Sequence, residues 1–379
     1  MIFLLAAIVC TSAIALLFKV SESRGLNRYA LTAANYATAV LVSAGSLLGL
    51  GGTIGDPHDH PPSVIGSPSH AAQTQDDRAA TTDPASAVAQ EPSSDATHGH
   101  HDAATPADIW AEIQRAAFAP ASAHELPVVS AAARLTWATL IGLVAGVLFV
   151  LGFLYYHHSV REHGAGLAGA FIKLGVLVPM SLSMVVWQEW PSLWQAVGIA
   201  LALLSLGLVY APALLQGFRR AQQQPSATPS TAARGSAVLL LFLFGGMAEF
   251  SNKVYEKVGL VGVGTTLDQL RGSLTFLLVT FSVALLLSLA LAWRRRQPVS
   301  SRDLLFGALL GLPNLFASTF LILSLDTIPA AVAFPAFAAG SIVVVNLVST
   351  TVFGERLRLR EWAAIGFTIA ALVLLNLAT

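Results

Sequence analysis

The chain has 379 residues, of which 55% are hydrophobic and only 11% are charged, and its mean hydropathy is +0.67. Soluble domains carry about 25% charged residues, so this composition excludes a water-soluble globule and predicts an all-α polytopic membrane protein. The formal net charge of zero gives no indication of nucleic-acid binding, and the single cysteine, Cys10, excludes an internal disulfide framework.

Ten apolar segments are long enough to be transmembrane helices. The first follows no basic region and is succeeded by a second apolar run, so we interpret it as a retained helix rather than a signal peptide. Three connections are very short (188–191, 325–328 and 353–359), which predicts antiparallel neighbours. The ten segments span about 2–19, 30–51, 135–156, 165–187, 192–213, 236–255, 272–293, 303–324, 329–352 and 360–378.

Two stretches interrupt this pattern. Residues 51–130 are rich in His, Pro and Ala and have little bulky apolar content, so we expect a disordered insertion after the second helix. Within it, the pattern near 106–118 predicts a short amphipathic helix on the membrane surface. A second polar stretch, 214–235, is expected to be a linker between residues 1–213 and 236–379.

An internal repeat relates these two parts. The octet KVSESRGL at 19–26 recurs as KVYEKVGL at 253–260, each time after an apolar run. The sequence WQEWPSLWQAVG (187–198) likewise resembles FGERLRLREWAAIG (353–366). Five helices in each half would make the halves cross the membrane in opposite senses, and such inverted repeats are typical of secondary transporters.

The five-plus-five plan and the link FGERLRLREW before the final apolar helix resemble the EamA-like branch of the drug/metabolite transporter superfamily. The resemblance covers nearly all of the chain except 51–130. It implies ten helices around a central cavity lined mainly by the first, third, fourth, sixth, eighth and ninth. It also implies export or exchange of small metabolites, amino acids or drug-like molecules, without naming the substrate.

Charged residues inside apolar segments are candidates for substrate binding or ion coupling, because each costs about 2.5–3.5 kcal/mol in a membrane helix. Glu249 and Lys253 lie one turn apart, so they either neutralise each other or separate to bind substrate and a proton. Lys173 is a second candidate, for an anionic group or for Glu249. Lys19 matches Lys253 in the repeat, as an interface anchor or as one of two cationic gates.

Buried amides need partners, so polar residues in apolar surroundings either join helices or line a cavity. Prolines in the eighth and ninth helices, Pro313 and Pro335, interrupt the backbone ladder and are further pointers to a binding site. The polar candidates are Asn35, Tyr36, Asn252, Asn314 and Asn346.

The histidines of the insertion leave an alternative open, namely a divalent-metal transporter or sensor. No defined metal site is expected, and the weak candidates are His58, His60, His98, His100 and His101. A membrane enzyme or lipid-handling scaffold is a third hypothesis, but no Ser-His-Asp set, HExxH motif or P-loop supports it, and no cofactor is implied.

The leading hypothesis is a secondary active transporter of the inner cell membrane, with proton coupling at Glu249 as one form of it. Its partners would be a small-molecule substrate and the lipid bilayer, with a homo-oligomer left open. Counting Lys and Arg puts both termini and 51–130 outside and RRR (294–296) inside. The family resemblance implies cytoplasmic termini instead.

Overall fold

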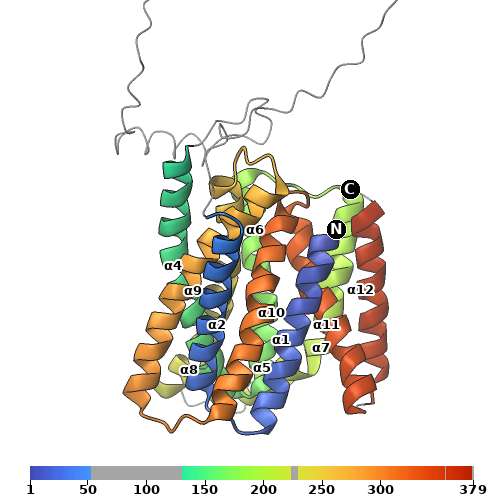
Figure 1. Cartoon of the computed structure of the whole chain (residues 1–379). Coiled ribbons are helices and arrows are strands. Elements are labelled where there is room, and N and C mark those ends of the chain that lie inside the picture. The colour runs from blue at the N-terminus through green and yellow to red at the C-terminus, as the bar shows by residue number, and fades with distance from the viewer. Residues whose placement is uncertain (53–129, 223–228, 355, 378–379) are drawn as a thin grey trace, which may run out of the picture.

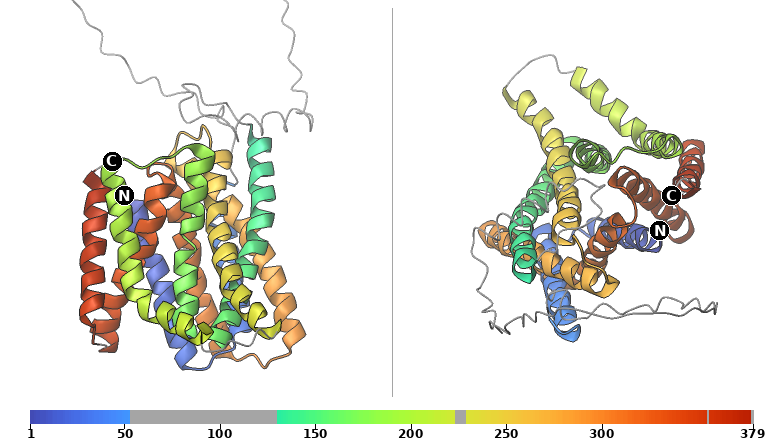
Figure 2. Two further views of the ribbon diagram at one scale, coloured as in Figure 1. Left: turned by 180° about the vertical axis from the view of Figure 1, so that it is seen from behind. Right: turned by 90° about the horizontal axis from the view of Figure 1, so that it is seen from above.

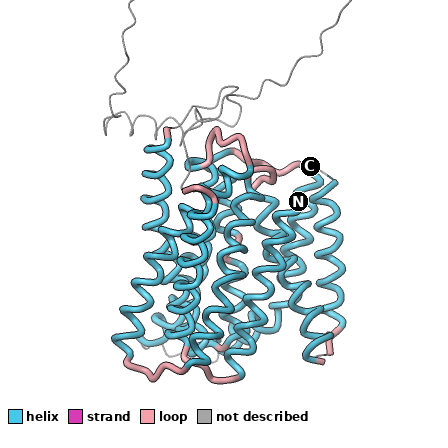
Figure 3. The backbone as a smooth tube through the Cα atoms, in the orientation of Figure 1, coloured by secondary structure: helices cyan, strands magenta, loops and turns pink. Residues whose placement is uncertain are grey.

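The computed structural model describes residues 1–52, 130–222, 229–354 and 356–377. This part of the chain forms a bundle of long helices and contains no strand (Figure 1; Figure 3). Nine of its spans are long and apolar enough to cross a membrane, which confirms the predicted fold class. The helices are α1 (Ile2–Ser23), α2 (Arg28–Gly49), α4 (Ala131–His163), α5 (Ala165–Leu174), α6 (Leu177–Trp187), α7 (Leu193–Gln222), α8 (Pro229–Gly259), α9 (Thr266–Arg295), α10 (Ser301–Leu325), α11 (Ala330–Phe353) and α12 (Leu359–Leu377).

Four helices start at a residue whose side chain accepts from their free backbone N–H groups. Asn27 accepts from two amides at the start of α2, and Ser130 and Thr265 cap α4 and α9. Ser300 and Asp303 form a reciprocal capping box at the start of α10. Gly354, with φ of 66°, takes the left-handed conformation that ends α11.

α7 runs on to Gln222 and α8 already begins at Pro229, so helix occupies most of the stretch 214–235 that we expect to link the two halves. Helices can extend beyond the apolar layer with polar residues, so polar composition alone does not mark their ends. The insertion at 51–130, its short amphipathic helix and its histidines lie almost wholly outside the described residues.

The fourth apolar segment is broken in the middle, where one continuous helix was expected. The chain turns at Gly175 and Val176 between α5 and α6. Pro179 has no N–H to donate to the carbonyl of residue 175, so the ladder lacks a bond at this point. Gly175 also lies so close to α8 that a Cβ on it would be 3.2 Å from the Gly246 nitrogen. By contrast, α10 and α11 continue as helices through Pro313 and Pro335.

Two glycine pairs bring helices from different halves into close contact. A Cβ at Gly146 of α4 would be 2.6 Å from the carbonyl oxygen of Thr280 in α9. A Cβ at Gly311 of α10 would likewise be 2.5 Å from the carbonyl oxygen of Asn35 in α2. Both belong to GxxxG spacings, which allow helix backbones to approach where lipid supplies no hydrophobic drive.

Helices of the first half and their counterparts in the second half pack on equivalent partners. α4 packs on α8 and α9, and correspondingly α10 packs on α1 and α2. α2 packs on α9, α6 on α11 and α7 on α12, so each of these helices meets its own counterpart five spans further on. A two-fold relation between the halves would produce this pattern, and it supports the inverted repeat, which stays a prediction.

Both ends of the described chain lie at one end of the bundle (Figure 1). We call this the termini end; α2 also ends there and α4 begins there. We call the opposite end the arginine end, because α1 joins α2 and α9 joins α10 there through arginine-rich links. Viewed along the bundle, the helices surround an interior rather than forming one flat layer (Figure 2).

Candidate functional site

A cavity of about 620 Å³ lies in the interior of the bundle. α1 contributes residues between Thr11 and Lys19, and α4 contributes residues between Phe149 and Tyr156. These positions fall in the halves of α1 and α4 that are nearer the arginine end, since both helices begin at the termini end. The central cavity therefore occupies the middle of the bundle and its arginine end.

Two oppositely charged side chains reach the cavity from different helices. Lys173 comes from α5 and Glu249 from α8, and each is only partly accessible, as expected for a side chain that lines an enclosed space. Lys173 Nζ donates to Ser341 Oγ of α11 at 2.9 Å. Asn252 Nδ2 donates to Glu249 Oε2 at 3.3 Å, and the two charges interact electrostatically. Lys173 and Glu249 thus line the same cavity without forming an ion pair, and their pairing stays a prediction.

An amide pair stands on the facing wall. Asn314 of α10 donates from Nδ2 to Asn35 Oδ1 of α2 at 3.3 Å, and both side chains line the cavity. Tyr36 lies beside them, and its ring stacks on Phe281 with centroids 5.8 Å apart. These groups leave hydrogen-bonding capacity directed at the cavity, because an amide can make more bonds than this single contact uses.

Six of the nine residues predicted for the site line this cavity: Lys19, Asn35, Tyr36, Lys173, Glu249 and Asn314. Lys19 lies at its edge and donates to Ser349 of α11 at 3.2 Å. Asn252, Lys253 and Asn346 are not among the lining residues. Asn252 acts instead through Glu249, as described above.

Lys253 belongs to a cluster of ion pairs nearer the termini end, which we call the ion-pair cluster. Its fully buried Nζ lies 3.0 Å from Glu189 Oε1 and 2.8 Å from Glu256 Oε2. Lys257 Nζ lies 2.9 Å from the same oxygen of Glu189. Lys253 therefore does not neutralise Glu249, although the two residues are one turn apart.

Glu189 joins three elements through this cluster. It lies in the link after α6, pairs with two lysines of α8, and accepts at 3.0 Å from the backbone N–H of Ala330 at the start of α11. Burial by itself raises the pKa of this carboxyl, but the charges and hydrogen bonds of Lys253 and Lys257 outweigh burial and hold the pKa below its ordinary value. Glu189 is thus ionised at neutral pH and fixes the termini end of the bundle.

The helices that line the cavity differ from the family expectation in three respects. The first, third, fourth, sixth and eighth spans contribute as expected. The second span, α2, contributes three residues and the fifth span, α7, contributes one, although the resemblance included neither. No residue of the ninth span, α11, is among the lining set. α11 reaches the site only indirectly, through the bond from Lys173 to Ser341.

Sequence analysis did not single out several aromatic residues of the cavity wall. Phe149, Phe153 and Tyr156 come from α4, and Tyr210 comes from α7. Tyr210 is the only polar aromatic residue of its apolar segment, and that isolation was the signal that could have identified it. Phenylalanines in an apolar run carry no such signal, since most of them face lipid or core.

No group of three or more His, Cys, Asp or Glu side chains is placed to hold a metal ion in the part of the chain that the structure describes. The histidines proposed as weak ligands fall outside that part. The metal hypothesis therefore gains no support from the described residues.

Residues 259–377 match the model of the EamA-like transporter family. The match covers α9 to α12 and so confirms the resemblance to this family over most of the second half of the chain. No curated protein matches the chain. The EamA-like match and the apolar spans together support a multi-pass membrane transporter, which agrees with the expectation that the chain is not an enzyme.

Proposed function

We propose that this protein is a secondary active transporter that moves a small metabolite or drug-like solute across the inner cell membrane by alternating access. The observation that carries the proposal is that Lys173 and Glu249 line one central cavity from the packed helices α5 and α8 and interact electrostatically. Charged groups in membrane helices are costly and commonly mark substrate or ion pathways. Because charged groups lower the stability of a membrane bundle, their presence in the cavity indicates a role in transport.

The two ends of the bundle differ in a way that suits alternating access. At the termini end, the ion-pair cluster ties the link after α6, the end of α8 and the start of α11 together. The central cavity lies towards the arginine end. Such a structure corresponds to one of the two states that a transporter alternates between, with the ion-pair cluster as the closed gate.

The repeat supplies a physical basis for the second state. In an inverted repeat, one half can adopt the conformation of the other, which closes the open end and opens the closed one. Lys19 occupies in the first half the position that Lys253 occupies in the second. We therefore assign Lys19 to the opposite gate, where it donates to Ser349.

Proton coupling is the finer part of the proposal. Glu249 is partnered by an amide and by the more distant charge of Lys173, and no lysine or arginine is within ion-pair distance of it in the described structure. A substrate anion that draws Lys173 towards itself would weaken this interaction and favour protonation of Glu249. Carboxylates serve as proton carriers in many transporters.

Transport by purified protein in liposomes tests the proposal. A thermal-stability screen with amino acids and other small metabolites would first identify a ligand, because binding to the folded state raises its apparent stability. Counterflow of that ligand should be abolished or greatly reduced in Glu249→Gln and Lys173→Met. Asp326→Asn is the matched control, since Asp326 is exposed at the end of α10. No counterflow of any tested solute would contradict the proposal.

A further inference from the structure

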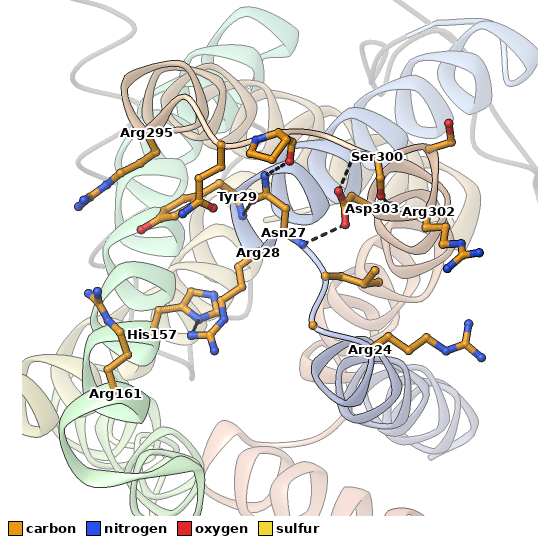
Figure 4. Close-up of a pocket in the computed structure, with 15 residues that line it drawn as sticks. Arg24, Asn27, Arg28, Tyr29, His157, Arg161, Arg295, Ser300, Arg302 and Asp303 are labelled. Carbon is orange, nitrogen blue, oxygen red and sulfur yellow. Dashed lines mark hydrogen bonds between the residues drawn. The ribbon is translucent and has the colours of Figure 1, made fainter.

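A second and larger cavity opens at the arginine end of the bundle. Its volume is about 1040 Å³. Residues of α2, α4, α9 and α10 and of the links before α2 and α10 form its walls. We call it the vestibule (Figure 4). Five arginines line it, namely Arg24, Arg28, Arg161, Arg295 and Arg302.

The vestibule adjoins the central cavity. On α4, Phe153 lines the central cavity and His157, one turn further on, lines the vestibule. On α2, Arg28 lines the vestibule and Thr32, again one turn further on, lines the central cavity. The rings of Phe153 and His157 meet edge to face with centroids 4.1 Å apart.

The single carboxylate among the lining residues does not neutralise these arginines. Asp303 accepts from the backbone N–H of Asn27 at 2.9 Å through Oδ1 and from that of Ser300 at 2.7 Å through Oδ2. Both oxygens are thus engaged in fixing the starts of α2 and α10, and the side chain is buried. The vestibule therefore keeps a large excess of positive charge.

Three of the five arginines contact aromatic or histidine rings. Arg24 lies over the ring of Phe306, and Arg295 lies over the ring of Tyr29. Arg28 Nη1 lies 3.5 Å from His157 Nδ1. No salt bridge to Asp or Glu involves any of the five within the described residues, and each of them is exposed to solvent.

We propose that the vestibule binds phosphate-type oxyanions with two or more negative charges, either on a soluble phosphorylated compound or on an anionic phospholipid headgroup. Guanidinium groups bind phosphate through paired hydrogen bonds, and like charges that surround a concave site raise the local anion concentration. Figure 4 shows Arg161 and Arg295 on one side of the pocket and Arg24 and Arg302 on the other, so an anion between them could contact both walls.

The tendency of cytoplasmic links to carry Lys and Arg does not by itself account for this arrangement. Arg294 and Arg296 lie at the same end of the bundle and serve that tendency equally well, yet neither lines the vestibule. Five arginines, from α2, α4, α9, α10 and the link before α2, by contrast converge on one concavity. Arg294 and Arg296 therefore provide a control, because their substitution removes the same amount of charge outside the vestibule.

The test uses full-length protein in phosphatidylcholine nanodiscs, with pyrophosphate as the probe and sodium chloride added to equal ionic strength. Thermal unfolding is followed as pyrophosphate is titrated. The test variant is the double substitution Arg161→Gln with Arg302→Gln, which removes one arginine from each of two facing segments. The control variant is Arg294→Gln with Arg296→Gln.

We expect saturable stabilisation of the unmodified protein and of the control, and a loss of affinity of about tenfold per arginine in the test variant, as for charge-assisted hydrogen bonds. If pyrophosphate is inactive but phosphatidic acid in the discs stabilises the protein, and only the test variant loses that effect, the ligand is a lipid headgroup. If neither anion acts, or both variants lose the effect equally, the proposal is wrong.

Chemical protection keeps the test decisive if the test variant does not fold. Phenylglyoxal modifies accessible arginines, so pyrophosphate or phosphatidic acid should slow its reaction at Arg161 and Arg302 and not at Arg294 and Arg296. Equal rates at all four positions would overturn the proposal. Neither measurement involves transport, so a failure here is separate from a failure of Glu249→Gln to affect transport.

Discussion

Lys253 Nζ lies 3.0 Å from Glu189 Oε1, so a fully buried ammonium of α8 is held by a carboxylate of the link after α6. The two residues are 64 positions apart in sequence, since 253 minus 189 is 64. Because Glu189 also caps the start of α11, one side chain connects three elements at the termini end. We therefore expect loss of the ion-pair cluster to lower the free energy of unfolding more than loss of other contacts in the bundle.

Replacing Glu189 with Gln should destabilise the protein by about 2 kcal/mol, the range for a lost charge-assisted hydrogen bond. Lys253 would remain buried with Glu256 as its remaining ion-pair partner in the cluster. Thermal unfolding in detergent measures the change. The control is Glu361→Gln, whose partner Arg360 is 3.6 Å away and one-third exposed, so its loss should cost less than about 1 kcal/mol. Equal losses in the two variants would contradict the special role of Glu189.

The same cluster predicts a dependence on pH. The folded-state pKa of Glu189 is lowered, so its contribution to stability is present in full above the ordinary glutamate pKa, about 4.3, and is lost as pH falls through the lowered value. The charged groups that face it are Lys253 and Lys257, which pair with it, and Glu256, which pairs with Lys253. The stability gap between the unmodified protein and Glu189→Gln should be constant from pH 8 to about pH 5 and should narrow below about pH 4. A gap that stays constant into strong acid would argue against this assignment.

The glycine contacts predict a position-dependent effect of a single methyl group. Gly146→Ala places a Cβ 2.6 Å from the Thr280 carbonyl and must separate α4 from α9, which should cost about 1–3 kcal/mol. Gly45→Ala in α2 meets nothing within 4 Å and should be neutral or stabilising by up to about 1 kcal/mol, because alanine favours helix. Unfolding midpoints of both variants in the same detergent provide the comparison. Equal unfolding midpoints of the two variants would show that α4 and α9 are not closely packed at Gly146.

The electrostatic link between Lys173 and Glu249 predicts that substitutions at these positions are not additive. Each single variant, Lys173→Met or Glu249→Gln, leaves one charge without its opposite in the cavity, whereas the double variant removes both. A double-mutant cycle on thermal stability should therefore give a coupling of about 1 kcal/mol or more. The cycle that pairs Lys173→Met with Asp326→Asn should give a value near zero, because Asp326 lies at the end of α10, away from the cavity. Coupling of equal size in both cycles would contradict a specific pair.

Sequence alone predicted the helices well because membrane spans depend on long apolar runs, which a single segment displays by itself. It also predicted that Lys173, Glu249, Asn35 and Asn314 avoid lipid, because such groups are costly there, and left open whether they join helices, pair with other charges or line a cavity. All four line the central cavity.

Other features depended on partners that the local sequence does not reveal. The role of Glu189 requires two lysines of α8 and the start of α11, which only the folded bundle brings together. Lys253 was paired with Glu249 by helical spacing, but the spacing alone could not show that Glu189 and Glu256 lie closer to its ammonium group. The break at Gly175 had a local signal in Pro179, yet its position also reflects the close approach of α8.

The break between α5 and α6 has a consequence for how the cavity wall can move. α5 is a ten-residue helix that is not continuous with α6, and Lys173 stands in its last turn, two residues before the unwound pair. A tilt of α5 about Gly175 and Val176 would move its far end most, without bending a continuous helical ladder. The fourth span thus places its charge beside the joint, where the ammonium group stays near Ser341 while the rest of α5 moves.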